Sequence, residues 1–303
     1  MISRLEQLLP APPDGTIGIG DDAAVVRKPG QPDRLYTTDA VIEGQHFAAD
    51  ADRFAVGHKA VARVLSDIAA MGGEPRWLLV DVVASPDMAM EELEAIYRGM
   101  SALAGETGAT IIGGDLSESQ ELSLHVFGVG ETPEGRALLR STAETNDVLV
   151  VTGSLGGSNH GRHLTFKPRL AEGVFLRDWA TALIDLSDGL ATDIRHICGM
   201  SETGALINLP EIPISPDVHA HEPDHTKLMH ALTDGEDYEL LFTVSPDDFP
   251  AFVKAWDAEF SEACHRVGML LPEAGVIKTI DAYNTIKDLD RKAFEHFRTS
   301  HHH

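Results

Sequence analysis

The stretch "GTIGIGDDAAVV" (residues 15–26) places two adjacent aspartates, Asp21 and Asp22, between a glycine-rich turn and a short apolar strand. Unpaired charge next to a buried strand is costly, so these carboxylates need a compensating partner. Aspartates recur at strand ends or small-residue turns in four more segments: "TTD" (37–39), "SD" (66–67), "GGD" (113–115) and "DLSDG" (185–189). Because strand ends meet at a common sheet edge in α/β folds, the pattern predicts such a fold with clustered carboxylates.

A single aspartate beside a glycine is most often an ordinary turn or cap residue, so the prediction rests on the group. Clustered carboxylates repel one another unless some are protonated or a cation lies between them. Hard oxygen ligands, with no cysteine or histidine spacing beside them, favour Mg²⁺, which shares its coordination with substrate phosphates. This is the equipment of phosphoryl transfer. The GxxxxGK[ST] loop and the complete GxGxxG fingerprint are both absent from the sequence.

Composition limits the classes of partner. The 303 residues, 43% of them hydrophobic, are enough for two moderate domains. Lys plus Arg number 24 against 48 Asp plus Glu, a net charge of −24 that repels nucleic acid and anionic membranes. Two cysteines fit a reducing compartment, and no apolar run is long enough to span a membrane. We therefore expect a soluble cytoplasmic protein that binds neither nucleic acid nor membrane, and we expect "SHHH" (300–303) to be a tag remnant.

Hydrophobic periodicity predicts an α/β (α+β) protein of two domains, residues 1–139 and 140–299. In the first we expect two helices, 57–73 and about 90–105, and strands over 23–26, 34–39, 77–83, 110–115 and 122–130. In the second we expect helices from about 190 and near 247–262, and strands ending at Gly153 and over 181–186, 236–244, 264–270 and 274–280. Ser187 or Asp188 is the expected N-cap of the helix that follows "DLSDG". Asp67 falls at the margin of the apolar face of the first helix, where a carboxylate can reach a cleft.

The motifs "GIGDDAAVV", "TTDAVIEGQHF", "GHKAVARVLSDIAAMGGEP", "DLSDGL" and "GEDYELLFT" occur in an order that resembles thiamine-monophosphate kinases. That family belongs to the superfamily of aminoimidazole ribonucleotide synthetase and selenophosphate synthetase, and the resemblance covers roughly residues 15–245. It implies ATP-dependent phosphorylation of thiamine monophosphate to the diphosphate by direct transfer with several Mg²⁺ ions. It also implies a homodimer in which the N-terminal sheets pair into a barrel, and a C-terminal α/β sandwich.

The resemblance implies roles for individual residues. Asp67, as a bridging carboxylate, Asp39 and Arg140 are the implied catalytic residues. Glu236 and His46 are implied at the acceptor, where an anion suits the permanent cation of the thiazolium ring. The implied nucleotide contacts are Gly114, Asp115, Arg140 and Ser187, with Tyr97 as a further candidate on the adenine side or, alternatively, a core residue. The implied metal ligands are Asp22, Thr37, Thr38, Asp39, Asp67, Asp115, Asp185 and Asp188.

Two departures from the family pattern bear on the acceptor. After "VTGSLGGSNHG" (151–161) the chain reaches "GRHLTFKPRL" (161–170) almost at once, where the family usually has a helix. In "DRKAFEHF" (290–297), Arg291 or a neighbour stands where the family often has a tryptophan. Two alternatives therefore stay open: a superfamily enzyme that uses ATP on another small acceptor, and a non-catalytic homologue that binds nucleotide or metal.

Overall fold

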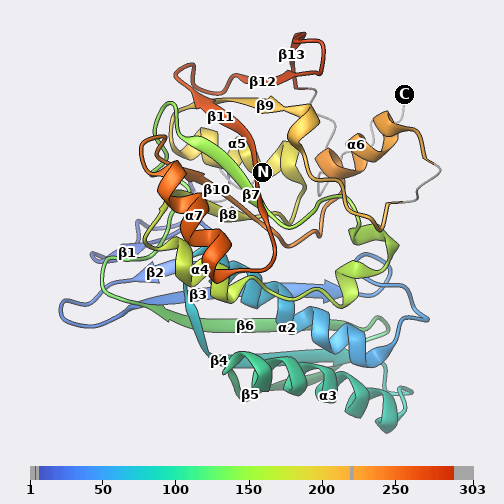
Figure 1. The fold of residues 1–303 in the computed structure, drawn as a ribbon. Coiled ribbons are helices and arrows are strands. Elements are labelled where there is room, and N and C mark those ends of the chain that lie inside the picture. Colours follow the sequence, from blue (N-terminus) through green and yellow to red (C-terminus); the bar gives the residue numbers. More distant parts are fainter. Residues whose placement is uncertain (1–3, 5–6, 219–221, 290–303) are drawn as a thin grey trace. The chain divides into compact units, whose positions relative to one another are not determined.

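In the computed structural model, which describes residues 4, 7–218 and 222–289, the chain forms two compact units (Figure 1). The first comprises the chain up to Leu139 together with Leu164–Asp178, and the second comprises Arg140–His163 and the chain from Trp179 onward. The chain thus first changes unit at Arg140, and residues 164–178, which the sequence alone assigns to the second domain, belong to the first unit. Arg291, the segment 290–297 and the expected tag remnant at 300–303 lie outside the described residues.

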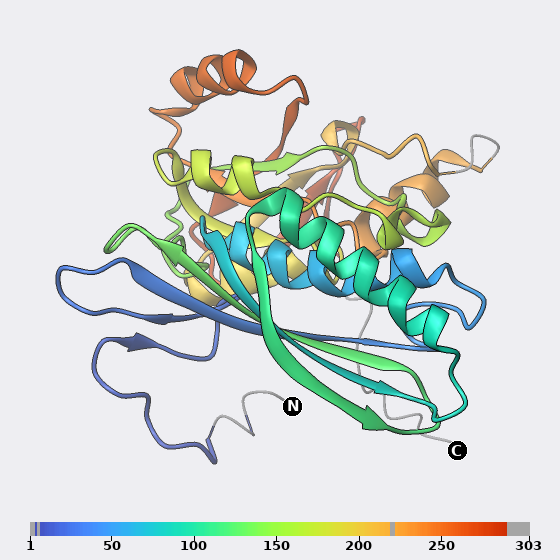
Figure 2. The ribbon, with the colours of Figure 1, turned by 90° about the horizontal axis from the view of Figure 1, so that it is seen from below.

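The first unit is a six-stranded mixed sheet with helices α2 (Arg53–Ala70) and α3 (Met90–Thr107) along one face (Figure 2). The short helix α4 (Leu170–Leu176) packs on α2, and a side chain at Gly173 would meet the backbone oxygen of Ala69 at 2.2 Å. The strands and both long helices expected here are confirmed. In spatial order the strands are β1 (Thr16–Ile17), β2 (Ala24–Val26), β3 (Asp33–Ile42), β6 (Ser123–Thr132), β4 (Glu74–Ala84) and β5 (Thr110–Glu118), with only β4 and β5 parallel.

Helix α2 begins four residues earlier than its apolar periodicity predicts, because Asp52 caps it by accepting the N–H of Ala55 at 3.0 Å. The helix buries Val61, Leu65 and Ile68 completely. It also carries charged residues along its length, so it is amphipathic rather than uniformly apolar. No helix formed by the described residues combines the length and the apolar character needed to cross a membrane.

The second unit is a seven-stranded mixed sheet with helices on both faces. Leu241 of β10 belongs to the core under α5 (Leu190–Met200) and α6 (Asp224–Thr233). The next residue, Phe242, faces the other way and packs against Phe252 and Trp256 of α7 (Phe249–Glu259). In spatial order the strands are β13 (Ile286–Asp288), β12 (Ile277–Ile280), β9 (Gly204–Asn208), β11 (Cys264–Leu271), β7 (Val148–Thr152), β10 (Leu240–Val244) and β8 (Ala180–Asp185).

Two local predictions for this unit are wrong. The strand expected over 236–244 is extended only from Leu240, because Glu236 (φ 66°) and Tyr238 (φ 50°) have left-handed backbones that no strand accommodates. Neither Ser187 nor Asp188 caps α5, since the N-cap is Gly189 and no side chain bonds there. Helix α6 was not expected, because its sequence buries only Ala231 and Leu232 and so has little apolar periodicity.

Candidate active site

The predicted site residues fall in both units, and each group is described within its own unit. In the first unit, helix α2 presents Lys59, Arg63 and Asp67, four residues apart and therefore on one face. Lys59 is completely buried, and its Nζ donates to the backbone oxygen of His46 at 2.6 Å. Arg63 donates to both carboxylate oxygens of Asp39, from Nε at 2.5 Å and from Nη2 at 2.8 Å. We call Lys59, Arg63 and Asp67 the α2 stripe.

Asp67 lies among oxygen atoms. Its Oδ2 accepts the hydroxyl of Thr37 at 2.5 Å, and a carboxylate oxygen of Asp22, from the turn before β2, lies within 4.8 Å of one of Asp67. Two half-buried carboxylates this close repel each other, and a divalent cation relieves that repulsion. The donor set, carboxylate and hydroxyl oxygens without sulfur or nitrogen, fits Mg²⁺.

Side chains alternate between the two faces of a strand, so the three residues of the "TTD" motif do not all point to the same side of the sheet. The buried Thr37 and the half-buried Asp39 lie on the face of β3 that meets α2, whereas the intervening Thr38 points to the opposite face and is exposed. The structure therefore brings Thr37, Asp39 and Asp67 to one side of the sheet. The side chain of Thr38 lies on the other side.

The "GGD" motif lies on the edge strand β5. Asp115 is exposed and accepts the hydroxyl of Ser117 at 2.9 Å. Gly114 has a φ of 156°, and a Cβ there would come within 1.7 Å of the backbone oxygen of Val80. Only glycine fits at this position, because any side chain would collide with the backbone of the neighbouring strand β4.

The other predicted residues of the first unit are His46 and Tyr97. The Nδ1 of His46 accepts the N–H of Ile42 at 3.0 Å, so this ring nitrogen closes the turn after β3. Tyr97 on α3 is 39% exposed and lines a cavity of about 460 Å³ with Glu94, Arg98, Ser101 and Ile111. Burial and then the charge of Asp81 raise the pKa of the Tyr97 phenol. Its exposure places Tyr97 at the rim of a cavity rather than inside the core.

In the second unit, Asp185 ends β8 and is buried, and Asp188 follows in the turn before α5. Ligand atoms of Asp188, Asp193 and His196 all lie within 4.8 Å of one another. Asp193 is buried and accepts the backbone N–H of Asp188 at 3.2 Å. Burial raises the pKa of Asp193 well above its ordinary value, and the charges of Asp188 and Asp185 add to this effect. The hydrogen bond from Asp188 and the charge of Arg140 oppose it, which places Arg140 near these carboxylates.

The predicted acceptor residue Glu236 lies in the same unit, beside the turn that carries Ser187. The N–H of Glu236 donates to the backbone oxygen of Ser187 at 2.8 Å. Its carboxylate lies 3.4 Å from Nδ1 of His163 and accepts the hydroxyl of Tyr238 at 3.4 Å. The second unit thus brings the "DLSDG" and "GEDYEL" motifs together, although they lie some fifty residues apart in the chain.

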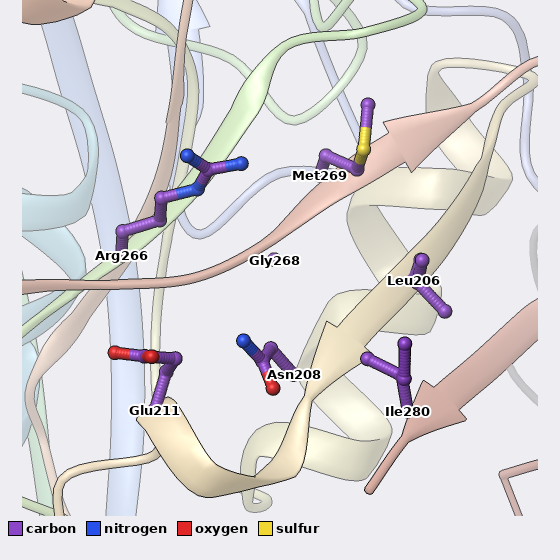
Figure 3. Close-up of a pocket in the computed structure, with 7 residues that line it drawn as sticks. All are labelled: Leu206, Asn208, Glu211, Arg266, Gly268, Met269 and Ile280. Atoms are coloured by element: carbon purple, nitrogen blue, oxygen red, sulfur yellow. The ribbon is translucent and has the colours of Figure 1, made fainter. Parts of the chain in front are cut away.

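A further cavity of about 390 Å³ opens on the sheet of the second unit, between β9, β11 and β12 (Figure 3). Its lining includes Arg266, Asn208 and Glu211 over an apolar floor of Leu206, Met269 and Ile280. None of the predicted site residues lines it. The cavity therefore has no part in the predicted chemistry.

Sequence reasoning missed several polar residues around these groups. Lys59 and Arg63 share the four-residue spacing that puts Asp67 on their face, and this spacing is the signal that identifies them. Asp193 and Asp237 have no such spacing. Both are identified only by their burial in the folded chain, and Asp237 also by its hydrogen bonds with Gly156 and Arg162, which are distant in sequence.

Comparison with known proteins places these groups in context. The family model for "AIR synthase related protein, N-terminal domain" matches residues 20–132. The thiamine-monophosphate kinase of Escherichia coli (strain K12) is 38% identical over 255 residues, 76% of this chain and 77% of the relative. That of Salmonella typhimurium is 34% identical and covers 94% of this chain and 93% of its own.

Solved structures give the same result. The AaThiL complex with AMPPCP and TMP superposes with a TM-score of 0.84 at 27% identity, covering 98% of this chain and 96% of that one. The thiamine-monophosphate kinase of Stenotrophomonas maltophilia K279a superposes with a TM-score of 0.78 at 29% identity, covering 91% and 93%. The likeness therefore extends over both units.

Proposed function

The chain belongs to the thiamine-monophosphate kinase family, and from this premise we propose that it transfers the γ-phosphoryl group of ATP to thiamine monophosphate, giving thiamine diphosphate. The main support for this function is the 38% sequence identity between this chain and the thiamine-monophosphate kinase of Escherichia coli, over three quarters of the chain. The chain's own residues support it, since carboxylates at strand ends and turns are the ligands that phosphoryl transfer requires.

We assign the metal ligands in two groups. In the first unit, Asp22, Thr37 and Asp67 would hold Mg²⁺, with Asp39, Thr38 and Asp115 as further ligands. In the second unit, Asp185 and Asp188 would contribute. When bound, Mg²⁺ neutralises charge on the phosphates of both substrates. Asp39 is already paired with Arg63 through both oxygens, so a metal there either shares the carboxylate with the guanidinium or displaces it.

The remaining assignments concern the substrates. For the nucleotide we assign Gly114 on the exposed edge strand β5, Ser187 in a half-buried turn and Tyr97 at the rim of a cavity. Arg140 suits bidentate contact with phosphate. At the acceptor, His46 contacts the phosphate side, and Glu236 the cationic ring.

No general base is needed, because the attacking phosphate oxygen is ionised at neutral pH, and positioning with charge neutralisation supplies the rate.

We also propose that two copies pair through the first unit. The edge strand β5 is exposed along almost its whole length, including Ile112 (60%) and Leu116 (61%). On the face of β4 away from its buried residues, Trp77 and Leu79 are 40% and 41% exposed. An exposed apolar edge strand is a site for pairing with another chain. The barrel of two N-terminal sheets that the family resemblance implies would cover this surface.

The test is direct. The protein is incubated with ATP, Mg²⁺ and thiamine monophosphate, and thiamine diphosphate is quantified by chromatography. Formation of the diphosphate supports the proposal. ATP consumption that depends on a different acceptor would favour the other superfamily activity, and nucleotide binding without consumption would favour a non-catalytic homologue. The cytoplasm, which supplies ATP and keeps the two free cysteines reduced, is the compartment we propose.

A further inference from the structure

The loop Gly235–Tyr238 of the second unit has an unusual backbone. Glu236 (φ 66°) and Tyr238 (φ 50°) are both left-handed, a conformation that residues with side chains rarely adopt. Such strain persists only where the surroundings fix the backbone firmly, and it is commonly found at ligand sites. The contacts that hold this loop are therefore informative about its use.

One set of contacts comes from the segment that follows β7. Arg162 donates from Nη2 to Oδ1 of Asp237 and to the backbone oxygen of Ser154, each at 2.9 Å. The N–H of Gly156 donates to the other oxygen, Oδ2 of Asp237, at 2.8 Å. Ser158 donates its hydroxyl to the backbone oxygen of Gly235 at 2.6 Å. The side chain of Asp237 is 2% exposed, so its carboxylate depends on these donors for compensation.

A second set comes from the turn after β8. The N–H groups of Glu236 and Tyr238 donate to the backbone oxygens of Ser187 and Leu186, at 2.8 and 2.9 Å. The loop is thus held on one side by the segment after β7, which bonds Gly235 and Asp237, and on the other by the turn after β8, which bonds the backbone of Glu236 and Tyr238. A change at Arg162 therefore reaches Glu236 through Asp237, the next residue along the loop, and through the neighbouring His163.

We propose that Arg162 is a positioning residue for the acceptor: its ion pair with Asp237 holds the strained loop so that the Glu236 carboxylate is fixed for the cationic ring of thiamine monophosphate. The inference rests on the proposed function, which gives Glu236 its role. Arg162 itself contacts no substrate. It acts through Asp237, and the neighbouring His163 reaches Glu236 directly at 3.4 Å.

The experiment is run at pH 8, where Asp237 is ionised, and compares Arg162→Met with a matched control, Arg266→Met. Arg266 lies in the same unit, and its side chain makes no hydrogen bond or ion pair with any residue that the structure describes (Figure 3). We expect Arg162→Met to raise the KM for thiamine monophosphate about tenfold, because the Glu236 carboxylate is no longer held at the cationic ring, with the KM for ATP little changed. The control should change neither constant. Equal rises in both KM values, or none, would overturn the proposal.

Arg162→Met leaves a buried carboxylate without its cation and can unfold the protein, so a second variant is needed. The double variant Arg162→Met, Asp237→Asn has no such charge and should recover the melting temperature of the unchanged protein. We expect it to keep the raised KM for thiamine monophosphate. A double variant with normal stability and a normal KM would show that the pair is only structural, and would overturn the proposal.

Glu236→Gln separates this inference from the function on which it rests. If Glu236→Gln raises the KM for thiamine monophosphate and Arg162→Met does not, the positioning role is wrong and the acceptor assignment stands. If Glu236→Gln leaves that KM unchanged in an active kinase, the role of Glu236 fails and the positioning role fails with it. If the unchanged protein does not turn over thiamine monophosphate, the proposed function fails, and calorimetric binding of thiamine monophosphate to the same variants still reports on the loop.

Discussion

Arg63 occupies both carboxylate oxygens of Asp39, a residue that the sequence assigns to a metal site. The two side chains are 13% and 24% exposed, so their pairing is partly protected from water. In the absence of a metal, the guanidinium supplies the positive charge that Asp39 needs. Arg63 and Mg²⁺ therefore compete for the same carboxylate.

Removing Arg63 should make the protein more dependent on Mg²⁺. In Arg63→Met, Asp39 adds its negative charge to those of Asp22 and Asp67, and we expect a loss of about 2 kcal/mol of stability without metal. Mg²⁺ should then raise the melting temperature more than it does in the unchanged protein. Differential scanning fluorimetry with and without Mg²⁺ measures both values. Arg76→Met, at an exposed ion pair of the same unit, is the control, and an equal Mg²⁺ effect in both variants would contradict the competition.

Asp67 should be essential for turnover but not for folding. Asp67→Asn keeps the shape and an oxygen that accepts the Thr37 hydroxyl, while it removes the charge that a metal needs. We expect kcat to fall by about 100-fold or more. The melting temperature should be unchanged or higher, because a carboxylate leaves a repulsive cluster. Asp87→Asn, at an exposed loop position, controls for charge, and near-normal kcat in Asp67→Asn would exclude the bridging role.

The succession of strands and helices along the chain was predictable, because the spacing of apolar residues follows which side of each element is buried, as in α2 and β4. The end of an element was less predictable where a side chain outside the apolar pattern decides it, as Asp52 does for α2. The loop at Glu236 was not predictable as a loop, since no sequence signal separates residues 236–239 from the apolar run that follows, and only contacts from residues 156–162 and 186–187 impose its left-handed turns.

The same reasoning applies to the site. Asp22 and Asp67 were predicted from recurring turn chemistry and Thr37 from the family resemblance, and the structure brings the three close together in the first unit. The partners that decide the charge of the site, Arg63 for Asp39 and Arg162 for Asp237, were not found. Each pair joins segments at least twenty residues apart, and nothing in a single sequence records such a contact.

The buried Asp237 should make stability depend on pH. Burial raises the pKa of its carboxyl from 3.8 to about 7, against the hydrogen bond from Gly156 and the charge of Arg162. Between about pH 4 and 7 the folded protein keeps a proton that the unfolded chain has released, so this group's stabilisation is lost as pH rises through that window. The loss is on the order of a few kcal/mol.

Asp237→Asn should remove this dependence. Urea unfolding at pH 5 and pH 8 gives the free energy of unfolding of both proteins, and the difference between the two pH values should be smaller in Asp237→Asn. Asp257→Asn, on the exposed side of α7, should behave like the unchanged protein. An Asp237→Asn variant with an undiminished fall in stability between pH 5 and 8 would show that another group titrates.

A charge on the exposed edge of the first sheet should prevent self-association. Ile112 is 60% exposed on the edge strand β5 and Leu79 is 41% exposed on the neighbouring strand β4, and both would be buried if the sheets of two first units closed into the proposed barrel. A glutamate at either position would be desolvated in that interface, which is costly, but remains in water in a monomer. Ile112→Glu and Leu79→Glu should therefore sediment as monomers at concentrations where the unchanged protein is a dimer. Met200→Glu replaces an apolar residue of α5 in the second unit that is 43% exposed, close to the value for Leu79, and should leave the dimer intact. If the unchanged protein sediments as a monomer, or if all three variants remain dimers, the pairing surface is not this edge.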